Sequence, residues 1–247
     1  MKIGGIIDIS TKDIPNRASM VIFTVGCNFK CEFCHNKYLL APDVGKFYGI
    51  DQLLKIIGSN SLVSGVSITG GEPTLQSDLS TLCQEIQQLG KYVSIDTNGS
   101  HPDIIENILP YINRIALDLK GPLNQERLKV ITGVAVKLED IEKTIDLVNK
   151  SSKVEFEIRT TYVGNLLTSE DLENMLMFLN QKQFKGTYVL QQYQFLEGVG
   201  EQFKQIFQKP EHDALINLLK PYQEIDFPFQ IFLRDDIVGY KNRNELF

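Results

Sequence analysis

The chain has 247 residues, is 43% hydrophobic and carries a formal net charge of −6, which is ordinary for a globular protein with one large core. Its 25 basic residues are scattered, which argues against a nucleic-acid-binding surface, since neutralising phosphates takes clustered Lys and Arg. The start MKIGGIIDIS lacks the apolar core of a signal peptide, and no apolar run approaches the roughly 18 residues of a membrane span. We therefore expect a cytoplasmic protein without nucleic-acid or membrane partners, with one domain over 1–247, a core of about 18–195 and a C-terminal extension of about 205–247.

Short β-like stretches alternate with longer helical stretches along the chain. Strands are expected at 18–25, 64–70, 91–98, 113–121, 153–163 and 186–195, and helices at 49–58, 75–90, 101–112, 137–151 and 168–183. Pro102 and a Thr168 or Ser169 cap are typical of helix N-termini. An irregular loop is expected before residue 137. The extension is expected to add a helix at 210–223 and a β-like stretch at 227–234, over one end or edge of the sheet.

This alternation predicts the fold class. Strict βα repeats give parallel strands joined by right-handed crossovers. Six strands are too few for the eight of a closed barrel, so we expect a partial (β/α)6 TIM-type barrel, open on one side. Polar residues and glycines fall just after the strands, at their C-terminal ends, where the active sites of such folds lie.

Three of the four cysteines lie within eight positions, in a loop that follows the first predicted strand. Cys27, Cys31 and Cys34 have the spacing C-x3-C-x2-C. A loop of this length can bring three thiolates around one inorganic cluster, whereas a structural zinc site closes with a fourth Cys or His. His35 could in principle be that ligand, but adjacent residues rarely converge on one metal. The spacing therefore favours a [4Fe–4S] cluster on three cysteines, with one iron open to another ligand.

The remaining cysteine and histidines offer no second ligand group. His101 and His212 each stand alone in the sequence, and Cys83 lies in the helical pattern LSTLCQEIQQL. We expect Cys83 to be a buried thiol without chemistry. So few cysteines make a secreted disulfide framework improbable and favour metal or redox chemistry in a reducing compartment.

The cysteine motif resembles the signature of the radical S-adenosylmethionine (SAM) enzymes, which carries an aromatic residue just before the last cysteine, here Phe33. The second predicted strand ends in SITGGEP, which looks like the glycine-rich segment with which this family receives the methionyl amino group of SAM. The resemblance implies that role for Gly70, Gly71, Glu72 and Pro73. Glycines let a backbone approach a ligand closely, although a plain βα turn also favours glycine and proline.

The third and fourth predicted strands end in SIDTNGS and IALDLKG, and each delivers a carboxylate to the same end of the sheet. A lone Asp after a strand is commonly a helix cap or a surface charge. Similar segments line the SAM site in the activating enzymes of the superfamily, and the resemblance implies cofactor-binding roles for Asp96, Thr97, Asn98, Asp118 and Lys120.

Charge complementarity refines these roles. Lys120 could pair with the carboxylate of SAM, and Arg159, at the end of the fifth strand, could add a further cation, although a surface ion pair is an equal alternative. Asp96 and Asp118 together are a candidate site for a monovalent cation, which oxygen ligands would hold. No catalytic side chain is expected beyond the cluster ligands.

The resemblance narrows to the activating proteins of anaerobic ribonucleoside-triphosphate reductase, because GCNFKCEFCHN, TGGEPTLQ, DTNGS, ALDLKGP and VITG occur in order, at similar spacings, over most of residues 1–195. It implies a glycyl-radical activase: the cluster reduces SAM, and the resulting 5′-deoxyadenosyl radical removes one hydrogen from a glycine of a partner enzyme. A donor such as flavodoxin or ferredoxin would supply the electron. An open barrel would leave a lateral gap through which a polypeptide could reach the cluster.

Two other functions remain open from the sequence. The same motifs serve small-molecule radical enzymes such as 7-carboxy-7-deazaguanine synthases, because motif residues bind the shared cofactor. From a different class, the chain could be a non-catalytic iron–sulfur or zinc-binding module.

Overall fold

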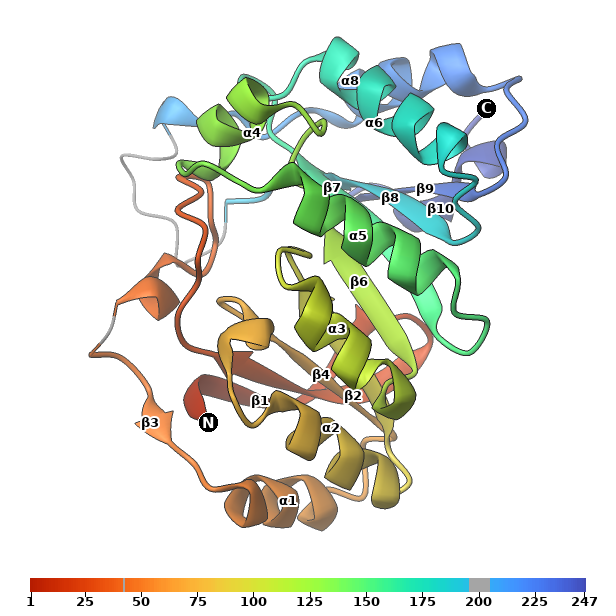
Figure 1. The fold of residues 1–247 in the computed structure, drawn as a ribbon. Coiled ribbons are helices and arrows are strands. Elements are labelled where there is room, and N and C mark those ends of the chain that lie inside the picture. The colour runs from red at the N-terminus through yellow and green to blue at the C-terminus, as the bar shows by residue number, and fades with distance from the viewer. Residues whose placement is uncertain (42, 196–204) are drawn as a thin grey trace. The chain divides into compact units, whose positions relative to one another are not determined.

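The computed structural model describes residues 1–41, 43–195 and 205–247 (Figure 1). The chain divides into two compact units. Unit 1 consists of Met1–Asn28, Asn36–Ala116 and Glu139–Glu155, and unit 2 of Phe29–His35, Leu117–Leu138 and Phe156–Phe247.

The strands form a mostly parallel sheet that is not closed. Unit 1 holds β1 (Lys2–Ile14), β2 (Arg17–Thr24), β3 (Lys46–Phe47), β4 (Gly65–Gly70) and β5 (Tyr92–Thr97). Strand β6 (Arg114–Asp118) runs from unit 1 into unit 2, which holds β7 (Glu155–Tyr162), β8 (Thr187–Gln192), β9 (Gln230–Asp235) and β10 (Gly239–Asn242). The hydrogen-bonded order is β3-β1-β2-β4-β5-β6-β7-β8-β9-β10, and the two end strands do not pair.

Strand direction confirms the predicted α/β class. In unit 1, β2 pairs in parallel with β4, and β4 with β5. In unit 2, β7, β8 and β9 are parallel neighbours. Antiparallel pairs occur only toward the ends of this order, at β1 with β2 and β3 and at β9 with β10, among the pairings that the described ranges show. The β-like stretch of the extension is thus a further parallel strand beside β8.

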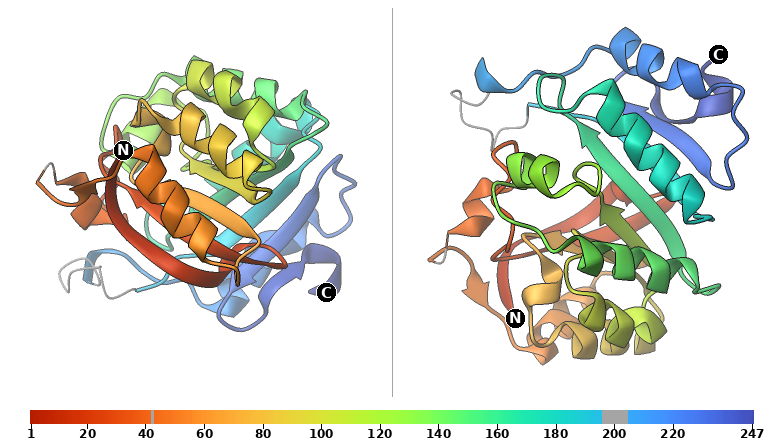
Figure 2. Two further views of the ribbon diagram at one scale, coloured as in Figure 1. Left: turned by 90° about the horizontal axis from the view of Figure 1, so that it is seen from below. Right: turned by 45° about the horizontal axis from the view of Figure 1, so that its top comes forward.

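Helices cover the strands of each unit. Unit 1 carries α1 (Ile50–Ser59), α2 (Leu79–Gln88), α3 (Pro102–Ile108) and α5 (Leu138–Asn149), with short 3-10 turns η1 (Lys37–Leu40), η2 (Pro73–Leu75) and η3 (Leu109–Tyr111). Figure 2 shows α1, α2 and α3 lying side by side on one face of the unit 1 strands. Unit 2 carries α4 (Gln125–Thr132), α6 (Ser169–Gln181), α8 (His212–Leu219), η4 (Lys220–Tyr222) and η5 (Arg243–Glu245).

The helix ends follow local sequence chemistry. Pro102 is the first residue of α3, where its missing N–H costs nothing. Thr168 caps α6, because its side chain accepts from Asp171 N while the Asp171 side chain accepts from Thr168 N. The predicted cap at this position is therefore confirmed.

Several elements were not predicted, of which β1 and α4 are the longest. The expected irregular loop before residue 137 contains α4, which Asn124 caps by accepting from Arg127 N. Strand β1 occupies the N-terminal stretch that the sequence identified only as lacking a signal peptide. It returns into β2 through a two-residue turn at Pro15 and Asn16, where Asn16 adopts a φ of 57°, a left-handed conformation that Asn tolerates well.

The core is built on buried strands whose apolar side chains, two residues apart in β4 and β5, share one face of the sheet. Fully buried side chains on the central strands of unit 1 include Ile22, Val66, Ile68, Val93 and Ile95. Each such side chain contributes roughly 1.5–3 kcal/mol by leaving water. This rigid sheet holds the polar residues at the carboxyl ends of its strands.

Candidate active site

The end of β4 runs against the end of β2 and the start of the cysteine loop, within unit 1. Gly71 N donates to Thr24 O at 2.9 Å, and Glu72 N donates to Gly26 O at 2.8 Å. A Cβ on Gly70 would lie 2.4 Å from Thr24 N, and one on Gly71 would lie 1.9 Å from Gly26 O. The two glycines therefore permit a close backbone approach to the chain itself, and their predicted approach to a ligand stays a prediction.

Glu72 is buried, with 1% of its surface exposed. Its Oε1 accepts from Thr74 N at 3.1 Å, from Thr74 Oγ1 at 2.6 Å and from Thr97 Oγ1 at 2.7 Å. Its Oε2 accepts from Asn98 N at 2.7 Å. The carboxylate thus joins the ends of β4 and β5. A binding role for Glu72 stays a prediction, but the structure also gives this residue a clear structural task.

Asn98 connects the end of β5 to the first part of the cysteine loop. Its Nδ2 donates to Asn28 Oδ1 at 2.9 Å and lies 4.0 Å from Cys27 Sγ, while its Oδ1 accepts from Ser100 Oγ at 2.6 Å. The sequence pointed to Asn98 but not to Asn28 or Ser100. Their position inside or directly beside the two motifs was the available signal.

Asp96, one strand residue before Thr97, faces a cation within unit 1. Its Oδ1 lies 3.7 Å from the Arg114 guanidinium, and that same Arg114 nitrogen donates to Ser94 Oγ at 2.8 Å. Asp96 and Arg114 are both buried. The Asp96 carboxylate is thus balanced by a basic side chain from β6.

Asp118 in unit 2 lies between two basic side chains. Lys120 Nζ is 3.1 Å from its Oδ2 and Arg159 Nε is 2.9 Å from its Oδ1. Burial alone raises the pKa of Asp118, but the charges and hydrogen bonds of Arg159 and Lys120 outweigh it and lower this pKa to about 2. The structure thus brings together three of the predicted site residues, Asp118, Lys120 and Arg159.

These pairings do not support the suggested monovalent cation. Asp118 is already neutralised by Lys120 and Arg159, and Asp96 faces Arg114. Carboxylates with basic partners attract a further cation only weakly, because the nearby positive charge opposes it.

Lys120 also interacts electrostatically with Cys31 and Cys34, in the second half of the cysteine loop. Burial lowers the pKa of Lys120, but Asp118 and the negative charges of Cys31 and Cys34 as thiolates raise it above its ordinary value.

His35 is fixed by neighbours in unit 2. Its Nε2 is 2.7 Å from Gln194 O, and its ring stacks on Tyr193 with the centroids 5.0 Å apart. A carbonyl partner requires Nε2 to carry the proton, so this nitrogen is not available to a metal. The contact engages Nε2 alone, so the expectation that His35 is not a fourth zinc ligand stays a prediction.

All four cysteines lie in the described ranges, and each is a thiol rather than half of a disulfide. Cys83 is fully buried, and burial raises its pKa to about 12, which confirms that it is a buried thiol. Cys31 is 7% exposed, while Cys27 and Cys34 are half-buried. Cys27 belongs to unit 1, and Cys31 and Cys34 belong to unit 2.

Comparison with known proteins decides the family. The family model described as the radical SAM superfamily matches residues 21–179. The chain belongs to the radical SAM superfamily. It is therefore a radical SAM enzyme, and membership implies a [4Fe–4S] cluster and SAM as its cofactors.

Curated radical SAM relatives fall into more than one functional group. A Methanocaldococcus jannaschii protein, provisionally named a glycyl-radical enzyme activating enzyme, is 34% identical over 223 residues, which are 85% of this chain and 88% of that protein. The 7-carboxy-7-deazaguanine synthase of Hyperthermus butylicus is 38% identical, but over 85 residues, which are 34% of this chain and 36% of the synthase.

A solved structure supports the radical SAM fold. Streptococcus suis SuiB bound to S-adenosylmethionine matches with a TM-score of 0.66 at 19% identity, covering 87% of this chain and 50% of SuiB. The chain thus spans about half the length of SuiB, and at this identity the likeness shows the fold alone. SuiB has also been solved bound to its precursor peptide SuiA.

The donor set fits the cluster that a radical SAM enzyme needs. Soft thiolates are the usual ligands of iron–sulfur clusters, and the glycine-cradled turn of Gly70 and Gly71 keeps bulky side chains away from the start of the cysteine loop. Within the described ranges, no three Cys, His, Asp or Glu side chains are already gathered as ligands around a single metal ion.

We expect replacement of Asp118 by Asn to change how stability depends on pH. The folded pKa of about 2 lies below the unfolded value, so this carboxylate stabilises the fold above about pH 4 and loses that effect as the pH falls toward 2. At pH 7 the free energy of unfolding of the Asp118→Asn variant should be about 1–2 kcal/mol lower than that of the wild type, a value discounted for partial solvent screening.

Urea unfolding of the metal-free protein at a series of pH values measures this effect. The difference between the wild type and Asp118→Asn should shrink between about pH 5 and pH 3. Asp43 is exposed, and Asp43→Asn serves as the control that should follow the wild type. A difference that stays constant down to pH 3 would show that the Asp118 ion pairs do not act as described.

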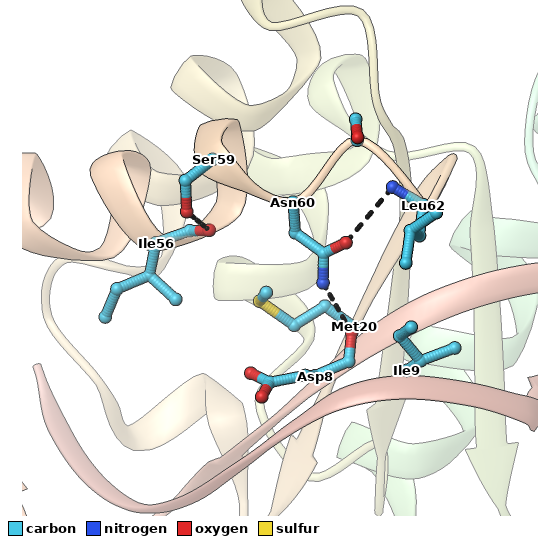
Figure 3. A pocket seen from close by; sticks show the side chains of 8 residues that line it. Asp8, Ile9, Met20, Ile56, Ser59, Asn60 and Leu62 are labelled. Carbon is cyan, nitrogen blue, oxygen red and sulfur yellow. Dashed lines mark hydrogen bonds between the residues drawn. The ribbon is translucent and has the colours of Figure 1, made fainter.

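A shallow cavity of about 400 Å³ lies elsewhere in unit 1 (Figure 3). Met20 and Ile56 contribute apolar walls, and Asn60 spans one side by donating from Nδ2 to Asp8 O at 2.7 Å and accepting from Leu62 N at 3.1 Å. None of the predicted site residues lines it, so we give it no part in the radical chemistry.

No helix in the described part of the chain combines the length and apolar character required to cross a membrane.

Proposed function

We propose that this radical SAM enzyme is a glycyl-radical activating enzyme, and that its partner is an anaerobic ribonucleoside-triphosphate reductase. The observation that carries the first part is the M. jannaschii relative named for this activity, which matches 85% of this chain and 88% of its own length. The match covers nearly the whole of both chains and so extends beyond the cofactor motifs of the sequence. The choice of partner rests on the order of the sequence motifs.

The proposed site uses Cys27, Cys31 and Cys34 as ligands of the cluster. When bound, the cluster would supply one electron, received from a donor such as flavodoxin or ferredoxin, to SAM, and the reaction as a whole would convert SAM to methionine and 5′-deoxyadenosine and a partner glycine to a glycyl radical.

The chain's own residues bind and orient SAM in this proposal. Lys120 offers an ammonium for the carboxylate of SAM, supported by its place beside Asp118 and the two thiols of unit 2. Asp96 and Thr97 are the last residues of β5 and Asn98 follows them, while the segment from Gly70 to Pro73 begins at the last residue of β4. Excluding water from these strand ends would protect the radical from side reactions.

The test mixes the reduced, reconstituted protein with SAM and the anaerobic ribonucleotide reductase of the same organism. We expect a doublet glycyl-radical signal on the reductase by electron paramagnetic resonance, with 5′-deoxyadenosine formed in a comparable amount. A reductase whose radical glycine is replaced by alanine should give no doublet. Polypeptide access is compatible with this fold, since SuiB was solved with a bound peptide.

The second candidate is a small-molecule radical enzyme. The observation in its favour is the 38% identity to a 7-carboxy-7-deazaguanine synthase, which is confined to 34% of this chain. Absence of the doublet, together with rapid 5′-deoxyadenosine release in the presence of a small heterocyclic substrate, would establish this second function instead.

A further inference from the structure

The C-terminal turn of α4 lies in direct contact with the cysteine loop, within unit 2. Lys30, one residue before Cys31, donates its backbone N–H to Thr132 O at 2.8 Å. Gly133 ends the helix with a φ of 71°, and a Cβ on it would lie 2.8 Å from Lys30 O and 3.3 Å from Lys30 Cβ. The loop backbone therefore occupies the space that a side chain at position 133 would take.

The turn is itself held by buried hydrogen bonds. Thr132 is fully buried, and its Oγ1 lies 2.7 Å from Leu128 O and 3.1 Å from Val134 O. Gly133 N donates to Lys129 O at 3.0 Å. These bonds fix the direction of the Thr132 carbonyl that receives the Lys30 N–H.

The rest of α4 is anchored to unit 2 at two further points. Arg127 donates two hydrogen bonds to the Asp171 carboxylate, one of them from Nε to Oδ1 at 2.9 Å. Its Nη2 also donates to Leu166 O at 2.7 Å. Ile131 Cδ1 lies 2.5 Å from the position of a Cβ on Gly121, the residue directly after Lys120. These contacts hold α4 in place within unit 2, and the end of α4 in turn holds the cysteine loop at Lys30.

We propose that Thr132 and Gly133 are positioning residues that hold the cysteine loop in the conformation that retains the cluster. This rests on the proposed ligand role of Cys31 and Cys34. A loop without secondary structure of its own keeps two ligands in place only if neighbouring groups fix its backbone. The Lys30 N–H bond and the close packing at Gly133 fix it immediately before Cys31.

Gly90 provides a matched control for a substitution at Gly133. Both glycines have a φ of 71°, and Gly90 has no atom within 4 Å of an added Cβ. Alanine at either position bears the same left-handed strain, but only Gly133→Ala presses a methyl group against Lys30. The comparison separates backbone strain from contact with the loop.

The experiment reconstitutes the full chain anaerobically and follows loss of the cluster to an iron chelator. Gly133→Ala should lose the cluster about tenfold faster than Gly90→Ala, a factor typical of overpacking. Its reduced electron paramagnetic resonance spectrum should be altered, while that of Gly90→Ala should match the wild type. Asn tolerates a positive φ, so Gly90→Asn should recover stability, whereas Gly133→Asn should still release iron quickly.

Thr132→Val gives a milder second variant, because it removes the hydroxyl while keeping the shape of the side chain. It should lose the cluster a few-fold faster than the wild type, and it carries the test if Gly133→Ala does not fold. Equal retention in Gly133→Ala and Gly90→Ala, or wild-type retention in Thr132→Val, overturns the inference alone. A wild-type protein that binds no iron overturns both the ligand assignment and this inference.

Discussion

Replacing Cys31 by alanine should leave the reconstituted protein without its cluster and without reductive cleavage of SAM. A radical SAM enzyme holds its cluster by three protein thiolates, so removal of one leaves two, too few to retain about four irons per chain. The same result is expected for Cys27→Ala and Cys34→Ala. Iron and sulfide analysis after anaerobic reconstitution measures the first effect, and 5′-deoxyadenosine formation with a strong reductant measures the second.

Cys83→Ala is the matched control for these three variants. Cys83 is fully buried in α2, and burial raises its pKa to about 12, so its thiolate is not accessible as a ligand. Its removal should lower stability by about 1 kcal/mol through a small cavity while the iron content stays at the wild-type value. Equal loss of iron in the Cys83 variant would contradict the assignment of the other three as the ligands.

Hydrophobic alternation was sufficient to predict the central strands and their helices. The predicted strand at 64–70 is β4 (Gly65–Gly70), and the predicted helix at 168–183 is α6 (Ser169–Gln181). These elements are buried against neighbours on both sides or along one face, so their apolar residues carry a clear period. Caps at Pro102 and Thr168 then placed the helix starts correctly.

Elements whose hydrophobic periodicity is weaker were not predicted. Helix α4 has eight residues and buries three of them, so its pattern is short, although Asn124 before it and Gly133 after it are regular end signals. Strand β1 contains two adjacent glycines, and its pairing with β2 shifts register three times. Such bulges break the strict alternation on which a strand prediction depends.

The sequence also could not predict which distant side chains of the site pair with one another. Asp118 and Arg159 are 41 residues apart and meet only because Asp118, the last residue of β6, lies beside the middle of β7. The sequence placed a carboxylate and a cation at strand ends, but which of them neutralise one another depends on side-chain direction. For this reason the two carboxylates suggested a cation site that the ion pairs of the structure do not support.

Glu72→Ala should destabilise the fold more than any other single change at the predicted site. From the sequence, we expected Glu72 to serve the cofactor. The structure shows it buried, accepting from Thr74, Thr97 and Asn98. Alanine would leave these buried donors without their acceptor, which should cost about 3 kcal/mol or more.

Urea unfolding of the metal-free protein and SAM binding by the reconstituted protein separate the structural role of Glu72 from the cofactor role. Glu72→Gln retains one acceptor oxygen, but its amide N–H₂ would face the Asn98 N–H, so an intermediate loss of stability is expected. Glu106 is exposed on α3, and Glu106→Ala should stay within about 0.5 kcal/mol of the wild type. If Glu72→Ala unfolds at the same urea concentration as Glu106→Ala while SAM affinity falls, Glu72 acts on the cofactor rather than as the acceptor that joins β4 to β5.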